Sequence, residues 1–126
     1  MNLPTDLKYT KSHEWVKDLG EGKVQLGLSD HAQSELGDLV FVNLPTVGDA
    51  LTAGQSFCDV ESVKAVSDVY SPVTGKVSAV NESLMDTPED INTDCYAAWL
   101  IEAEDITTTE PLLSASEYEA FIKEEA

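Results

Sequence analysis

The sequence predicts a mainly β domain with short helices and a C-terminal helix. Short alternating or apolar runs, separated by turn residues, fill much of the chain before its last third. A Pro-x-x-Gly sequence occurs twice, each time after an apolar-rich run, and a helix-capping sequence lies near the C-terminus. With 126 residues, of which 42% are hydrophobic, we expect one domain spanning residues 1–126 around its own core.

The first elements expected are a β-hairpin and a short helix. Residues 13–17 (HEWVK) are rich in strand formers, residues 23–28 alternate polar and apolar side chains, and the turn-rich residues 19–22 separate them. These two runs can pair as a hairpin. A helix is expected to begin after Ser29 and to end at Gly37.

A possible internal repeat follows. Residues 39–44 (LVFVNL) predict a buried strand that Pro45 closes, because proline cannot donate to a sheet. The sequence Pro-Thr-Val-Gly at 45–48 recurs as Pro-Val-Thr-Gly at 72–75, a spacing of 72 − 45 = 27 residues. Two similar halves would fit a small barrel or sandwich. The alternative is the chance recurrence of a common turn.

Residues 55–70, between the two Pro-x-x-Gly sequences, predict two strands joined near residues 63–65. This tip has neither glycine nor asparagine, which favours a longer loop built on a type I turn over a primed two-residue turn. Lys64 lies at the tip and is the only lysine or arginine between Lys23 and Lys76. We therefore expect its side chain to be exposed.

The last third of the chain is expected to be more helical. Residues 82–85 predict one helical turn, residues 87–94 a loop and residues 97–103 a strand. Ser114 and Glu117 have the spacing of a capping box, and Tyr118, Phe121 and Ile122 share one helical face. The chain therefore ends in an amphipathic helix packed on the body.

Charge excludes several classes of partner. Seven lysines and arginines against 24 acidic residues give a net charge of −17, which opposes binding to nucleic acid or to an anionic membrane surface. No apolar run is long enough to span a bilayer, and we expect neither a secretory signal nor a transit segment. Cytoplasmic localisation with free thiols is therefore expected. The charge could serve solubility alone or could also steer partner docking.

No catalytic or metal-binding pattern stands out. His13 and His31 are isolated in the sequence and form no zinc-ligand spacing. Cys58 and Cys95 have no basic neighbour that would lower the thiol pKa, so we expect inert thiols. Nucleotide-binding and nucleophile motifs are missing as well. The sequence predicts no metal site and no enzyme.

Lys64 is the remaining candidate for a function. It could be an ordinary surface lysine. It could also be the attachment point of a carried cofactor, since a carrier needs an exposed amine on a rigid turn of a small globular body. The residues alone leave both interpretations open.

The sequence around Lys64 resembles the lipoylation region of the glycine cleavage system H-protein family. The flanking Val63 and Ala65 differ from the methionines expected in a biotin carrier. Cys95-Tyr96-Ala97-Ala98-Trp99 lacks the glycine that the family usually has before its late tryptophan. The resemblance spans roughly residues 7–123 and rests on residues 60–65, 67–75, 9–16, 30–33, 36–42, 112–115 and 117–118.

The resemblance implies a fold and a function. The fold would be a barrel-sandwich hybrid with a lipoyl-domain core. Lipoate on Lys64 would carry the aminomethyl group of glycine from a pyridoxal-phosphate-dependent glycine decarboxylase to a tetrahydrofolate-dependent aminomethyltransferase, and a dihydrolipoamide dehydrogenase would then reoxidise it. A lipoate ligase or lipoyl transferase would attach the group. The alternatives are an H-like protein that relays lipoate to other complexes and a structural module with an unmodified Lys64.

The resemblance also implies roles for residues near Lys64. Glu61, three residues earlier and expected to be exposed, would help the ligase to choose its target. A cleft would shield the loaded arm, with polar groups at Ser12, Glu14 and Asp68 and an apolar wall at Leu28.

Overall fold

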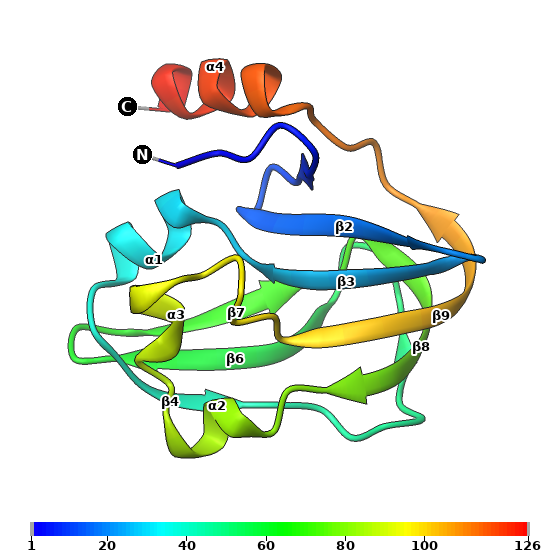
Figure 1. The fold of residues 1–126 in the computed structure, drawn as a ribbon, viewed down its shortest axis with the longest axis horizontal. Coiled ribbons are helices and arrows are strands. Elements are labelled where there is room, and N and C mark those ends of the chain that lie inside the picture. The colour runs from blue at the N-terminus through cyan, green and yellow to red at the C-terminus, as the bar shows by residue number, and fades with distance from the viewer. Residues whose placement is uncertain (1, 126) are drawn as a thin grey trace.

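The computed structural model describes residues 2–125, which form two antiparallel sheets with short helices around them (Figure 1). One sheet has the strand order β1-β2-β3-β9-β8-β5 and the other the order β4-β6-β7. The strands are β1 (Lys8–Tyr9), β2 (Glu14–Gly20), β3 (Lys23–Leu28), β4 (Leu39–Asn43), β5 (Ala50–Leu51), β6 (Ser56–Ser62), β7 (Val66–Tyr70), β8 (Val73–Val80) and β9 (Ile101–Thr109). The helices are α1 (Asp30–Leu36), α2 (Ser83–Asp86), α3 (Asp90–Thr93) and α4 (Ala115–Glu125). None of these helices has the length and apolar composition needed to cross a bilayer.

The predicted N-terminal hairpin and helix are confirmed. Strands β2 and β3 pair with Trp15 opposite Gly27, and a Cβ at Gly27 would lie 2.5 Å from the Trp15 ring, so the indole needs a glycine there. Ser29 caps the start of α1, because its side chain accepts a hydrogen bond from the Ala32 amide. At the other end of the helix, the Gly37 amide donates to the Gln33 carbonyl. This helix turns the chain from one sheet to the other.

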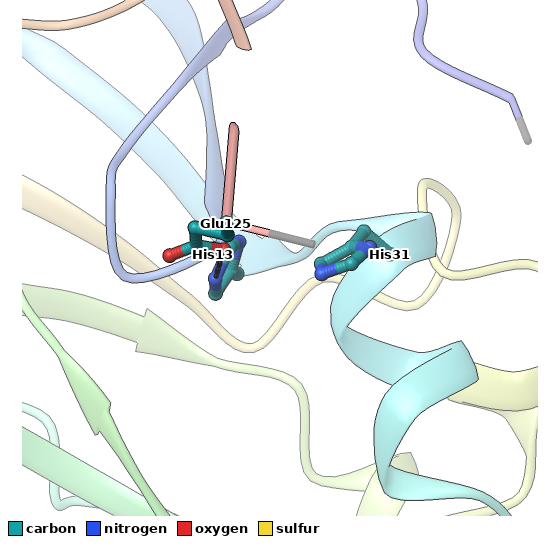
Figure 2. Close-up of side chains that lie close together, drawn as sticks. All are labelled: His13, His31 and Glu125. Carbon is teal, nitrogen blue, oxygen red and sulfur yellow. Dashed lines mark ion pairs between the residues drawn. The ribbon is translucent and has the colours of Figure 1, made fainter. Parts of the chain in front are cut away.

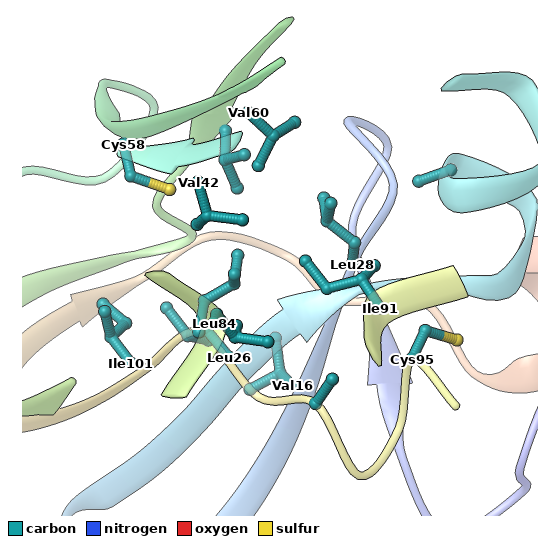
Figure 3. Close-up of a cluster of buried hydrophobic side chains, with 14 of the residues drawn as sticks. Val16, Leu26, Leu28, Val42, Cys58, Val60, Leu84, Ile91, Cys95 and Ile101 are labelled. Carbon is teal, nitrogen blue, oxygen red and sulfur yellow. The ribbon is translucent and has the colours of Figure 1, made fainter. Parts of the chain in front are cut away.

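The main core lies between the two sheets. Val16 and Leu26 from one sheet face Val42 and Val60 from the other (Figure 3). Further buried side chains come from the loops and the one-turn helices, such as Ile91 in α3. Burial of apolar area on both inner faces holds the sheets together.

Helix α4 packs on the same end of the molecule as the N-terminal segment (Figure 1). The predicted capping box is confirmed in both directions: the Ser114 amide donates to Glu117 Oε1 at 2.8 Å, and the Glu117 amide donates to Ser114 Oγ at 3.2 Å. The helix buries Tyr118 and Ile122, as its pattern predicts, and the Tyr118 ring stacks on Tyr9 with centroids 4.8 Å apart.

Strand β4 is less buried than its apolar sequence predicts. The strand ends before Pro45 as expected, but Val40 is 54% and Phe41 48% exposed. The expectation of a wholly buried strand is wrong because the pairing of β4 with β6 has a bulge between Leu39 and Phe41, which leaves both Val40 and Phe41 exposed on this edge strand.

Only the first Pro-x-x-Gly sequence forms a turn. Gly48 has a φ of 96°, whereas Gly75 lies inside β8 and pairs with Leu51. The prediction of a second turn at residues 72–75 is wrong because proline is tolerated just before a strand, where its missing N–H breaks no ladder bond. The end of the first copy nevertheless lies beside β8, since the Gly48 amide donates to the Val77 carbonyl.

The segment before β9 also differs from its prediction. Residues 87–94 are expected to form a loop but contain the one-turn helix α3. Just before this helix, Thr87 Oγ1 donates a hydrogen bond to Asp90 Oδ2. The strand expected at residues 97–103 begins only at Ile101 and extends to Thr109, because the amides of Ala97 and Ala98 bond to the Asp94 carbonyl in a turn. Neither alanine has a positive φ, so this loop does not require a glycine.

Candidate functional site

The predicted hairpin tip between β6 and β7 is confirmed, with Lys64 exposed on it. Ser62 closes the tip: its amide donates to the Ala65 carbonyl at 2.8 Å, and its Oγ accepts from the amides of Lys64 and Ala65 at 3.2 and 3.1 Å. The Val63 amide donates to the Asp38 carbonyl, which ties the tip to the start of β4. As predicted, no residue of the tip adopts the positive φ of a primed turn.

The Lys64 side chain lies over the end of α1. Its Nζ donates to the Glu35 carbonyl oxygen at 3.2 Å and makes no ion pair with a carboxylate of residues 2–125. A Cβ at Gly37 would lie 3.1 Å from Lys64 Cε, so the glycine lets the stem pass close to the backbone. The amine is therefore accessible and held by one weak contact.

A cleft of about 260 Å³ opens beside this lysine. Glu35 and Leu36 of α1 line it next to the Lys64 stem. All four residues for which the family resemblance implied an arm cleft line it together: Ser12, Glu14, Leu28 and Asp68. They come from the turn before β2, the start of β2, the end of β3 and the middle of β7. Only tertiary packing brings these segments together.

Glu14 is the buried polar group of the cleft. Its side chain is 1% exposed, and Oε1 accepts hydrogen bonds from Thr10 Oγ1 at 2.7 Å and Ser12 Oγ at 2.6 Å. Burial raises the pKa of this carboxyl above its ordinary value, and the hydrogen bonds from Ser12 and Thr10 oppose the rise. By contrast, Asp68 and Ser12 are exposed at the rim, and Leu28 is a buried apolar wall.

A second cavity, of about 450 Å³, lies on the other side of Ser12, with Lys11 and Glu110 in its lining. Its lining includes no residue of α1 or of the hairpin tip. The smaller cleft is therefore the one placed to receive a group attached to Lys64.

Glu61 is half-buried, so the expectation of a fully exposed side chain is wrong. It lies on the outward side of β6, and its cross-strand partners are Phe41 and Val66. Both partners are large exposed apolar side chains, at 48% and 64%, which flank the carboxylate and reduce its exposure. Glu61 therefore lies within an apolar surface close to Lys64.

The two histidines, isolated in the sequence, lie close together. The ring centroids of His13 and His31 are 4.8 Å apart, and both residues line the cleft. Sequence spacing gave no signal of this contact, because it depends on the turn before β2 meeting the N-terminal half of α1.

The two thiols are buried, which supports the expectation that they are inert. Cys58 and Cys95 are both free cysteines. Burial raises the pKa of Cys95 to about 12, and it raises the pKa of Cys58 further. Both remain protonated near neutral pH and are poor nucleophiles.

Known proteins resemble this chain over nearly its whole length. A family model described as "Glycine cleavage H-protein" matches residues 7–125. The chain belongs to the glycine cleavage H-protein family. Relatives named "Glycine cleavage system H protein" include one from Koribacter versatilis, 57% identical over 100% of this chain and 98% of its own, and one from Lachnoclostridium phytofermentans, 56% identical over 99% and 98%.

A crystal structure of a family member shares the fold. The glycine cleavage system H protein from Mycobacterium marinum superposes with a TM-score of 0.90 at 41% identity, covering 95% of this chain and 98% of its own. The family and the fold class expected from the sequence are thus confirmed. Membership makes the chain a carrier component of glycine cleavage, and the relay alternative is not favoured.

Proposed function

We propose that this chain carries lipoate in amide linkage on Lys64 and delivers it to the enzymes of glycine cleavage. The observation that supports the proposal is the position of the Lys64 amine, which is exposed on a hydrogen-bonded hairpin tip beside a cleft. The amine donates to a backbone carbonyl and forms no ion pair with a carboxylate of residues 2–125. A modifying enzyme can reach such an amine, and the rigid tip fixes where the attached group begins.

The residues around Lys64 fit the group that the family implies. When attached, lipoate would supply a dithiolane ring that opens as one sulfur takes the carried group and the other becomes a thiol, and thiol–disulfide exchange would restore the ring after the group has left. Leu28 and Leu36 offer apolar surface to its chain, while Ser12, Glu14 and Asp68 offer oxygens that can accept hydrogen bonds from an amine at its end. The protein thereby orients the arm and limits the access of water to it, and it performs no bond-making step of its own.

The partners follow from this role. We infer that the chain docks to glycine decarboxylase, to the aminomethyltransferase and to dihydrolipoamide dehydrogenase. A lipoate ligase or lipoyl transferase would bind it once, to attach the lipoyl group. Glu61, within the apolar surface next to the tip, would contribute to recognition by the ligase. Residues 1–126 would act as one domain in the cytoplasm, without nucleic acid or membrane.

Substitution of the lysine tests the proposal. Lys64→Arg keeps the charge and removes the acylatable amine, so incubation with a lipoate ligase, ATP and lipoate should leave its intact mass unchanged, whereas the wild type should gain one lipoyl group. Lys23→Arg is the matched control and should be modified like the wild type. Modification of the Lys64→Arg chain, or an unmodified wild type, would reject the proposal.

Reconstitution separates glycine cleavage from a relay role. Lipoylated chain mixed with glycine decarboxylase should support exchange between carbon dioxide and the carboxyl group of glycine, and the Lys64→Arg chain should not. A lipoylated wild type inactive in this assay would contradict the role in glycine cleavage while leaving Lys64 as the attachment site.

A further inference from the structure

A cluster of three side chains at the edge of the cleft has the composition of a metal site. His13 Nε2 lies 3.2 Å from Glu125 Oε2, and the ligand atoms of His13, His31 and Glu125 all lie within 4.8 Å of one another. Figure 2 shows the three side chains converging from separate segments: the turn before β2, α1 and the last turn of α4. We propose that these residues bind one divalent zinc ion.

The distances suit zinc. A tetrahedral zinc with nitrogen and oxygen ligands at about 2.0–2.2 Å places neighbouring ligand atoms roughly 3.3 Å apart. The pair formed by His13 and Glu125 already has this separation. His31 completes the set after a side-chain movement of about 1–2 Å, which a rotation of its imidazole on the surface of α1 can supply. Two imidazoles and one carboxylate form a ligand set found in zinc proteins.

The second nitrogen of His13 is already held by the protein. Its Nδ1 lies 2.8 Å from the Tyr118 hydroxyl, which in turn lies 2.7 Å from Ser29 Oγ. In the zinc-bound form, Nδ1–H would donate to Tyr118 and Tyr118 would donate to Ser29, which leaves the lone pair of Nε2 for the ion. Histidines that bind metals commonly have such an outer partner, which fixes the ring and its tautomer.

The backbone also holds His13 in an uncommon conformation. Its φ is 77°, a left-handed value that few residues other than glycine adopt. The His13 amide donates to the Thr10 carbonyl, and the Ser29 amide donates to the His13 carbonyl, so the surrounding turn fixes this conformation. The imidazole is therefore preoriented toward α1 and α4.

The negative charges around the cluster favour a cation there. Burial lowers the pKa of His13 below its ordinary value, and the neighbouring His31 adds to this effect while Glu125 opposes it. The Glu35 carboxylate, 3.9 Å from His31 Nε2, adds negative charge beside the cluster in a chain of net charge −17.

Bound zinc would join α4 to α1 and to the turn before β2. These three segments have no covalent link near this point, and the ion would add a direct connection between them at the mouth of the cleft. The fold should then resist unfolding more strongly as the zinc concentration rises.

Zinc titration of the untagged chain tests the proposal. A Lys64→Arg background excludes binding to the thiols of a reduced lipoyl arm. Calorimetry should show one zinc per chain and no comparable binding of Mg²⁺, which prefers oxygen ligands. The chain has two histidines, so the imidazole signals of an NMR spectrum report on both proposed nitrogen ligands, and both should shift with zinc.

Neighbouring carboxylates on α4 provide a matched pair of variants. Glu125→Gln should weaken zinc binding at least about tenfold, while Glu124→Gln should change it less than about twofold. Both side chains are exposed at the end of the helix, so both variants should fold, which circular dichroism verifies. Failure to bind zinc stoichiometrically, equal losses in the two variants, or unshifted imidazole signals would overturn the proposal.

Discussion

Ser62 is expected to set the geometry of the attachment site. Its Oγ accepts hydrogen bonds from the amides of Lys64 and Ala65, and the side chain is buried behind the tip. Ser62→Ala removes both bonds, together with the longer bond that Ser62 Oγ donates to the Ala65 carbonyl at 3.3 Å, and it adds no bulk. The backbone of the tip would then lose its internal acceptor and exchange between several conformations.

The cost follows from the two bonds. Each hydrogen bond contributes about 0.5–1.5 kcal/mol, and water can reach the freed amides because Lys64 and Ala65 are exposed, so we expect a loss of about 1–2 kcal/mol in the free energy of unfolding. Chemical denaturation measures this loss. Hydrogen exchange should speed up at the amides of Lys64 and Ala65, and lipoylation should slow because the ligase meets a less ordered target.

Ser78→Ala is the control for this prediction. Ser78 lies in a strand and its hydroxyl makes no hydrogen bond within residues 2–125, so the change in stability should stay below about 0.5 kcal/mol. If Ser62→Ala changes neither exchange at the tip nor stability beyond this control, the reasoning about Ser62 is refuted.

Four further substitutions test the site and its surroundings. Glu61→Ala should slow lipoylation with little change in stability, which a ligase assay and thermal unfolding measure. Glu14→Ala should make the loaded carrier lose its one-carbon group to water faster, seen as faster ammonia release, with lipoylation unchanged. Gly37→Ala should lower the free energy of unfolding by about 1–3 kcal/mol, because φ 79° and ψ −157° suit glycine alone. His13→Asn should lose less stability than the wild type when the pH falls from roughly 7 to 5, and chemical denaturation at each pH measures this difference.

The sign of the His13 effect follows from its pKa. Burial lowers the pKa of His13 in the folded chain, so the unfolded chain binds its proton more readily as pH falls. The stability that neutral His13 contributes is present above its unfolded pKa and is lost as pH falls through the folded pKa. A variant with the same pH dependence as the wild type would contradict this assignment.

The outcomes for the other substitutions are equally specific. Ligase kinetics unaffected by Glu61→Ala would remove Glu61 from target recognition. Equal ammonia release from wild type and Glu14→Ala would remove Glu14 from the cleft function. A Gly37→Ala chain as stable as the wild type would show that the end of α1 can relax into an ordinary conformation.

The sequence alone determined the elements whose signals are local. The Ser114–Glu117 capping box and the Ser29 and Gly37 boundaries depend on hydrogen bonds within one turn of chain, so residue types at short spacing predict them. The position of Lys64 at a hairpin tip also follows from local pattern, because two strand-forming runs flank it.

Tertiary structure alone decided where those elements meet. Glu14 is buried because the packed turn before β2 covers it. Glu61 is half-buried because Phe41 and Val66 lie beside it on the neighbouring strands. His13 and His31 approach each other only after the chain folds. Such contacts depend on the relative placement of distant segments, which no short sequence window contains. The place of Lys64 at a hairpin tip could therefore be predicted from the sequence and the residues of the cleft from the family resemblance, whereas only the folded chain shows that these residues line one cavity beside the lysine.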